Sequence, residues 1–170
     1  YFSKLECIEG ATLQEILDKS RPFKESEAMQ IILEVAEVLK YLASQKIVHR
    51  DVKLENMMLT DSKSSDSKFK NQRLKLIDFG IAKSALASVN TATGTIKGKF
   101  VYMSPEQSRG DQLDARSDLY SLGCMLYQML TGNLPFEGDT PLSVIRQQIE
   151  DDAPRVRDVR KEIPRRLEAV

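Results

Sequence analysis

The sequence has little that would support a disulfide framework or a membrane span. Its two cysteines, Cys7 and Cys124, lie far apart in a chain without a signal-like segment, which is typical of reduced, intracellular thiols. No apolar run is long enough to cross a bilayer. The 25 basic and 25 acidic residues cancel, so no global field attracts nucleic acid or an anionic membrane. We therefore expect a cytoplasmic globular protein with no nucleic-acid partner and no membrane segment in this chain, although a parent protein could be membrane-anchored outside this window.

An initiator methionine is also lacking, and both ends of the chain have the character of cuts through a domain. Tyr1 opens directly in a strand-like or core-like stretch, and the residues from Ile163 to Val170 read as the start of a helix. With 170 residues, 41% of them hydrophobic, the chain is long enough to bury a core as one domain. We expect one partial domain over 1–170, truncated at both ends.

Two helices are expected in the first quarter of the chain. Thr12 and Glu15 match a capping box, which predicts a short helix that ends at about Ser20. After Pro22, apolar residues at helical spacing predict a long amphipathic helix over 25–45 with one buried face.

Two further helices are expected in the second half. The stretch 117–130 is apolar on more than one side and is followed by Gly132, which predicts a central helix with a glycine stop. Pro141 suits the first turn of another helix over 141–149. Helices should therefore dominate this chain.

Short strands and polar loops fill the middle of the sequence. The segment Met57–Leu59 is too short for a helix, and Leu74–Ile77 predicts a short strand. Residues 61–72 are rich in Ser and Lys, which predicts a mobile surface loop, and 81–99 read as a flexible, hydroxyl-rich loop.

Four short motifs in a fixed order carry most of the functional signal. In chain order they are His49-Arg50-Asp51-Val52-Lys53-Leu54-Glu55-Asn56, Asp78-Phe79-Gly80, Ser104-Pro105-Glu106, and Asp118 opening the apolar helix with Gly123 inside it. The first motif alone would be a weak signal, because a polar loop after a helix is common. All four in this order make chance a poor explanation.

Together these motifs resemble those of the protein-kinase superfamily. The stretches Tyr102–Gln107 and Ala115–Gly123 resemble more particularly the bacterial Ser/Thr kinases of eukaryotic type, and the resemblance covers nearly the whole chain. It implies an α+β, protein-kinase-like fold, here as a mostly helical C-terminal lobe with short strands and without the N-terminal lobe. Within this partial catalytic domain the hinge would lie at about 5–10 and the C-terminal lobe over 11–170.

The resemblance implies transfer of the ATP γ-phosphate to Ser or Thr hydroxyls of protein substrates. Phosphoryl transfer has a loose transition state, so the protein mainly positions reactants and neutralises charge. Asp51 would accept the substrate's hydroxyl proton, and Lys53 would lie beside the γ-phosphate, as is typical of kinases with Ser/Thr substrates. Asn56 and Asp78 would supply hard oxygen ligands for Mg²⁺, or for Mn²⁺ in its place.

The implied nucleotide site begins in the hinge, whose backbone would hydrogen-bond adenine. Leu5 would be the gatekeeper, and Met58 would form an apolar floor under the base, although by itself Met58 reads as a core residue. The full ATP-binding set implied by the resemblance is Leu5, Glu6, Cys7, Lys53, Glu55, Asn56, Met58 and Asp78.

A structural and a regulatory role are implied for the two residues before Asp51. His49, the single histidine, would pack under Phe79 and be held by Asp118, rather than act as a general base. Arg50 is either a surface cation or the partner of a phosphorylated activation loop, and we favour the second. Candidate autophosphorylation sites in that loop are Thr91, Thr93 and Thr95.

The sequence also departs from the family pattern. Its eight glycines form no Gly-x-Gly-x-x-Gly, and no strand Lys or helix Glu precedes the hinge, so we expect weak or absent activity from this fragment alone. Lys99 stands where many Ser/Thr kinases have Thr. Glu106 lacks a later Arg partner, which would cost roughly 3–5 kcal/mol if the carboxylate were buried. The alternative to an enzyme is a pseudokinase that serves as a binding scaffold.

Overall fold

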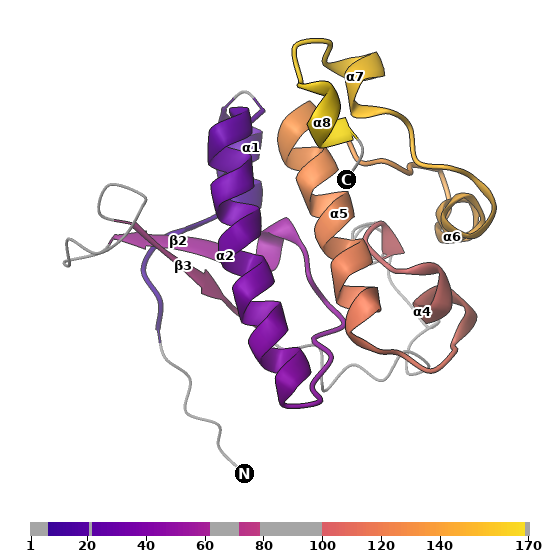
Figure 1. Ribbon diagram of the computed structural model, residues 1–170, viewed down its shortest axis with the longest axis horizontal. Coiled ribbons are helices and arrows are strands. Elements are labelled where there is room, and N and C mark those ends of the chain that lie inside the picture. The colour runs from indigo at the N-terminus through magenta and orange to yellow at the C-terminus, as the bar shows by residue number, and fades with distance from the viewer. Residues whose placement is uncertain (1–6, 21, 62–71, 79–99, 169–170) are drawn as a thin grey trace.

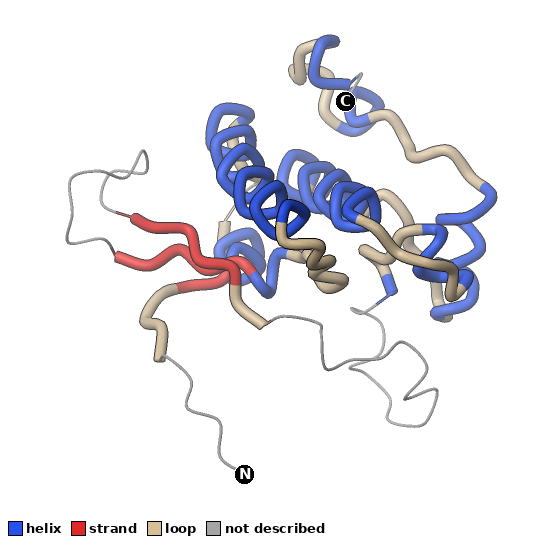
Figure 2. The backbone as a smooth tube through the Cα atoms, turned by 60° about the horizontal axis from the view of Figure 1, so that its bottom comes forward, coloured by secondary structure: helices blue, strands red, loops and turns tan. Residues whose placement is uncertain are grey.

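The computed structural model describes residues 7–20, 22–61, 72–78 and 100–168. In chain order its elements are β1 (Ala11–Thr12), α1 (Leu13–Lys19), α2 (Glu25–Ser44), the 3-10 turn η1 (Leu54–Asn56), β2 (Met57–Asp61), β3 (Gln72–Leu76), α4 (Pro105–Arg109), α5 (Ala115–Thr131), α6 (Pro141–Glu150), α7 (Val156–Val159) and α8 (Arg165–Glu168). The long helices form the body of the molecule, and the small sheet lies at one side of it (Figures 1 and 2). The expected helix-rich fold with short strands is confirmed.

The predicted helix ends are found where local chemistry places them. The Thr12 hydroxyl accepts from the Glu15 N–H at 3.1 Å, and the Glu15 carboxylate accepts from the Thr12 N–H at 3.1 Å, which completes the capping box of α1. Gly132 closes α5 with φ +81°, a left-handed conformation that glycine adopts without a steric penalty. Thus the sequence signals at these ends correspond to real caps.

The sheet is antiparallel in the order β1-β2-β3. Met58 lies opposite Thr12 on one side and Lys75 on the other, so β2 is the central strand. The interval predicted as a loop begins later and ends sooner than expected, because Asp61 and Gln72 are already strand residues paired with each other. The rest of that interval lies outside the described residues.

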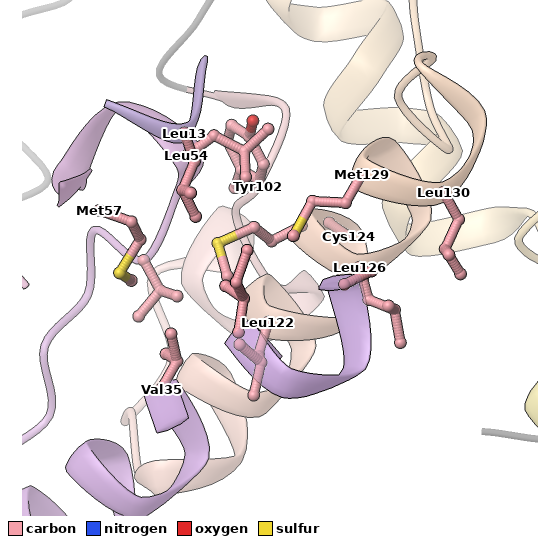
Figure 3. Packing of buried hydrophobic residues seen from close by; sticks show 14 of the residues in the cluster. Leu13, Val35, Leu54, Met57, Tyr102, Leu122, Cys124, Leu126, Met129 and Leu130 are labelled. Carbon is pink, nitrogen blue, oxygen red and sulfur yellow. The ribbon is translucent and has the colours of Figure 1, made fainter. Parts of the chain in front are cut away.

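The core lies between α2 and α5, which pack side by side (Figure 1). Ile31 and Val35 on α2 and Met125 and Met129 on α5 are at most 1% exposed. Burial of a side chain of this size stabilises the fold by about 1.5–3 kcal/mol. The same cluster includes Cys124, as expected for a core thiol (Figure 3).

A second part of the core joins η1 to the segment before α4. Leu13, Leu54 and Tyr102 lie together although they come from α1, η1 and the segment before α4 (Figure 3). The Tyr102 hydroxyl donates to Gln128 on α5, and burial raises the pKa of this tyrosine. The turn that carries Leu54 and Asn56 therefore packs against α1 and against Tyr102, which is itself bonded to α5.

The last helices close one end of α5. The Arg160 guanidinium donates to the Phe23 carbonyl at 2.7 Å and to the Leu130 carbonyl at 2.8 Å. These bonds satisfy a carbonyl near the C-terminal end of α5 and connect this end to Phe23, in the segment between α1 and α2. No helix in the described part of the chain combines the length and apolarity that a bilayer crossing needs.

Candidate active site

The loop between α2 and η1 is fixed by one carboxylate of α5. Asp118 is 3% exposed. Its Oδ2 accepts from the backbone N–H of His49 and its Oδ1 from the backbone N–H of Arg50, both at 2.8 Å. The prediction that Asp118 holds His49 is thus confirmed. The bond is to the backbone N–H of His49. The predicted packing under Phe79 involves a residue outside the described part of the chain.

The imidazole of His49 is fully buried. Burial lowers its pKa from the usual 6.5, and the nearby carboxylates of Asp118, Asp51 and Asp78 offset this only in part. A neutral, enclosed imidazole is consistent with the structural role expected for this residue.

Lys53 and Asn56 both contact the carboxylate of Asp51. The Asn56 amide nitrogen donates to Asp51 Oδ2 at 3.0 Å and to the Asp51 carbonyl at 2.7 Å. The Lys53 ammonium lies 3.3 Å from Asp51 Oδ1, with only 18% of the lysine side chain and 11% of the aspartate side chain exposed. These three residues, predicted as catalytic from the sequence, are therefore brought together with both carboxylate oxygens engaged.

The two residues predicted to bind Mg²⁺ lie close together along the strand ends. The Ile77 N–H donates to the Asn56 carbonyl at 2.8 Å, which places Asp78 one residue beyond this link. Because the Asn56 amide nitrogen donates to Asp51, the amide oxygen is the atom of this side chain that could bind a cation. Asp78 is exposed. An amide oxygen and a carboxylate are donors that Mg²⁺ prefers, so the residues present fit the ion.

Glu55 occupies a different environment from the other predicted nucleotide contacts. Its Oε2 is buried and has no hydrogen-bond partner in the described part of the chain. The side chain lines a cavity of about 660 Å³ together with Gln14, Tyr102 and Gln128. Met58, by contrast, is a half-buried residue of the central strand. Glu55 thus lines this cavity, whereas Met58 belongs to the sheet.

Several predicted residues lie outside the described part of the chain. These are Leu5, Glu6, Phe79, Gly80, Thr91, Thr93, Thr95 and Lys99. Cys7 is described and exposed, as is Arg50, which takes a positive φ of +68°.

The expectation of a costly, unpartnered carboxylate at Glu106 is not met. Glu106 is half-buried, and its Oε1 accepts from the Ser117 hydroxyl at 2.6 Å. Burial raises the pKa of this carboxyl, but hydrogen bonds from Ser117, from its own backbone and from Ser104 outweigh burial and lower the pKa overall. The sequence argument considered a cationic partner and missed the hydroxyl one residue before Asp118.

A helical body that presents an Asp–Lys–Asn cluster beside a strand-end aspartate has the architecture expected of a kinase C-terminal lobe. The family model for the protein kinase domain matches residues 2–168. The chain is 40% identical over 149 residues to the serine/threonine-protein kinase PknB of Mycobacterium leprae, covering 87% of this chain and 22% of that protein. These findings show that the chain belongs to the protein kinase family.

Other relatives have similar names. The chain is 40% identical over 158 residues to the probable serine/threonine-protein kinase SCO3848 of Streptomyces coelicolor, covering 91% of this chain and 22% of that protein. It is 32% identical over 166 residues to the probable serine/threonine-protein kinase PknB of Lactococcus lactis, covering 98% of this chain and 25% of that protein. The chain therefore spans a quarter or less of the length of these relatives.

Proposed function

We propose that this chain forms part of the catalytic domain of an ATP-dependent protein kinase that phosphorylates Ser or Thr. The observation that carries the proposal is the convergence of Lys53 and Asn56 on the two carboxylate oxygens of Asp51. The names of the relatives give independent support for the Ser/Thr class.

In this function Asp51 accepts a hydrogen bond from the substrate hydroxyl and then receives its proton. The bond from Asn56 and the nearby Lys53 ammonium fix the direction of the carboxylate before the substrate arrives. Because phosphoryl transfer depends mainly on positioning and charge neutralisation, this preorganisation is the main contribution of the loop.

Lys53 also supplies a positive charge on the side of Asp51 where phosphate would lie. Asn56 and Asp78 would hold a divalent cation, which neutralises phosphate charge when it is bound with ATP. The backbone link between Ile77 and Asn56 keeps Asp78 beside Asn56, the last residue of the segment 49–56, which we call the catalytic loop.

A regulatory role for Arg50 goes with this proposal. Its guanidinium is carried by an exposed residue directly before Asp51. Phosphorylation at Thr91, Thr93 or Thr95 would provide an anion for the Arg50 guanidinium. The segment that carries these threonines would then be coupled to the catalytic residues. Mass spectrometry of an active preparation checks this part, and three unmodified threonines would contradict it.

The full-length protein with labelled ATP and a protein substrate tests the main proposal. We expect label on Ser or Thr after phosphoamino-acid analysis, dependent on Mg²⁺ or Mn²⁺. ATP binding should be measured in parallel by calorimetry. A folded protein that transfers no label with either metal would contradict the enzyme function and favour a scaffolding pseudokinase.

A further inference from the structure

Gln107 connects α4 to the catalytic loop. Its side-chain Nε2 donates to the Arg50 carbonyl at 3.0 Å, across 57 residues of sequence. The backbone of Gln107 is itself held, because its N–H donates to the hydroxyl of Ser104 at 3.3 Å, and Ser104 is fully buried. The donor therefore projects from a fixed point toward the loop.

The bond falls on the peptide unit immediately before Asp51. A carbonyl of residue 50 and an N–H of residue 51 belong to one rigid plane. Gln107 binds the carbonyl end of this plane, and the N–H of Asp51 donates to His49 Nδ1 at 3.3 Å. Rotation of this peptide plane would turn the Asp51 side chain in another direction. The bonds at both ends of the plane resist that rotation.

This plane adjoins a residue in an unfavourable backbone conformation. Arg50 has φ +68°, which costs a non-glycine residue about 1–2 kcal/mol. Asp118, on α5, accepts hydrogen bonds from the N–H groups of His49 and Arg50, on the amino side of Arg50. Gln107 acts from α4 on its carboxyl side, so the conformation is held by bonds on both sides.

We propose that Gln107 is a positioning residue that fixes the Arg50–Asp51 peptide and thereby aims the Asp51 carboxylate. Its catalytic consequence rests on the proposed kinase function, whereas its effect on the loop does not. The role is assigned to the side-chain N–H group, because only a donor can bind the Arg50 carbonyl.

Two substitutions remove the donor and keep the length of the side chain. Gln107→Met leaves an apolar chain, and Gln107→Glu leaves a carboxylate that cannot donate at neutral pH. Gln147→Met is the matched control, since Gln147 Nε2 also donates to a backbone carbonyl, that of Glu137, at 2.8 Å. This control loses the same kind of bond on α6, away from the catalytic loop.

Amide hydrogen exchange of the full-length protein tests the structural half without any need for activity. We expect faster exchange of the Asp51 N–H in both Gln107 variants, with exchange in α5 unchanged and Gln147→Met like the wild type. Unchanged exchange at Asp51 in both Gln107 variants would overturn the proposal.

Steady-state kinetics test the catalytic half. We expect kcat to fall about fivefold in both Gln107 variants, with KM for ATP and for the substrate unchanged and the control at wild-type rate. Faster exchange with an unchanged kcat would overturn the link to Asp51. A wild type without phosphate transfer would refute the kinase function, and the exchange result would still decide whether Gln107 fixes the loop.

Discussion

Asp118 holds the backbone of His49 across 69 residues of sequence, with its Oδ2 2.8 Å from the His49 nitrogen. Its second oxygen holds the next amide, that of Arg50, at the same distance. A single buried carboxylate thus sets the start of the loop that carries Asp51. The central helix serves both as core and as the support of the site.

This pairing predicts a large loss of stability when one acceptor is removed. Asp118→Asn keeps the shape but turns an NH₂ group toward a backbone N–H, which leaves a buried donor unsatisfied. We expect the free energy of unfolding of the kinase domain to fall by about 1.5–3 kcal/mol, measured by urea denaturation. Asp114→Asn is the control, because Asn and Asp cap helices about equally well and Asp114 is exposed at the start of the same helix. Equal effects of the two substitutions would contradict the buried-acceptor account.

The single histidine predicts a clear pH signature. Burial lowers the pKa of His49, so the unfolded chain binds a proton at a pH where the folded chain does not. Stability should therefore fall as the pH drops below 6.5, until the lowered folded-state pKa is passed. In proton NMR the one imidazole C2–H resonance should titrate below pH 6.5. A midpoint at or above 6.5 would show that the ring is not enclosed as described.

The two cysteines should differ sharply in reactivity. Cys124 is 5% exposed, and burial raises the pKa of its thiol to about 12, so almost no thiolate exists at neutral pH. Cys7 is exposed. We expect iodoacetamide to label Cys7 quickly and Cys124 only after denaturation, as read by peptide mass spectrometry. Labelling of Cys124 in the native protein at a rate like that of Cys7 would contradict the burial.

Two glycines should respond to alanine with opposite signs. A Cβ at Gly10 would lie 2.3 Å from the Leu59 carbonyl oxygen, so Gly10→Ala forces the backbone of β2 to move and should cost about 1–3 kcal/mol. At Gly123 a Cβ would meet nothing within 4 Å, and alanine in the α5 interior should stabilise the domain by about 1 kcal/mol. Urea denaturation of both variants checks the signs. Stabilisation by Gly10→Ala would contradict the close approach of this segment to β2.

Much of the fold could be predicted because its signals are local. The capping pair Thr12 and Glu15, the apolar periodicity of α2 and the glycine after α5 each depend on neighbouring residues. The strand ends at Asp61 and Gln72 were missed because polar residues there gave no alternating pattern, and pairing between the strands extended them.

The arrangement of the proposed catalytic residues could not be predicted from the sequence. The motif identified Asp51, Lys53 and Asn56, yet their convergence depends on a turn that packs against α1. The contacts of Ser117 with Glu106 and of Gln107 with Arg50 join distant segments, and neither residue type signals such a partner in sequence. Long-range hydrogen bonds of this kind can be recognised only in the folded chain.

Transfer of phosphate by the full-length protein with Asp51→Asn tests the central claim most directly. The change keeps the size of the side chain but removes the charge that Lys53 neutralises and the group that we propose receives the substrate proton. We predict wild-type ATP affinity and a loss of kcat of about 10²-fold or more on Ser/Thr substrates. Transfer by Asp51→Asn at the wild-type rate would contradict the account.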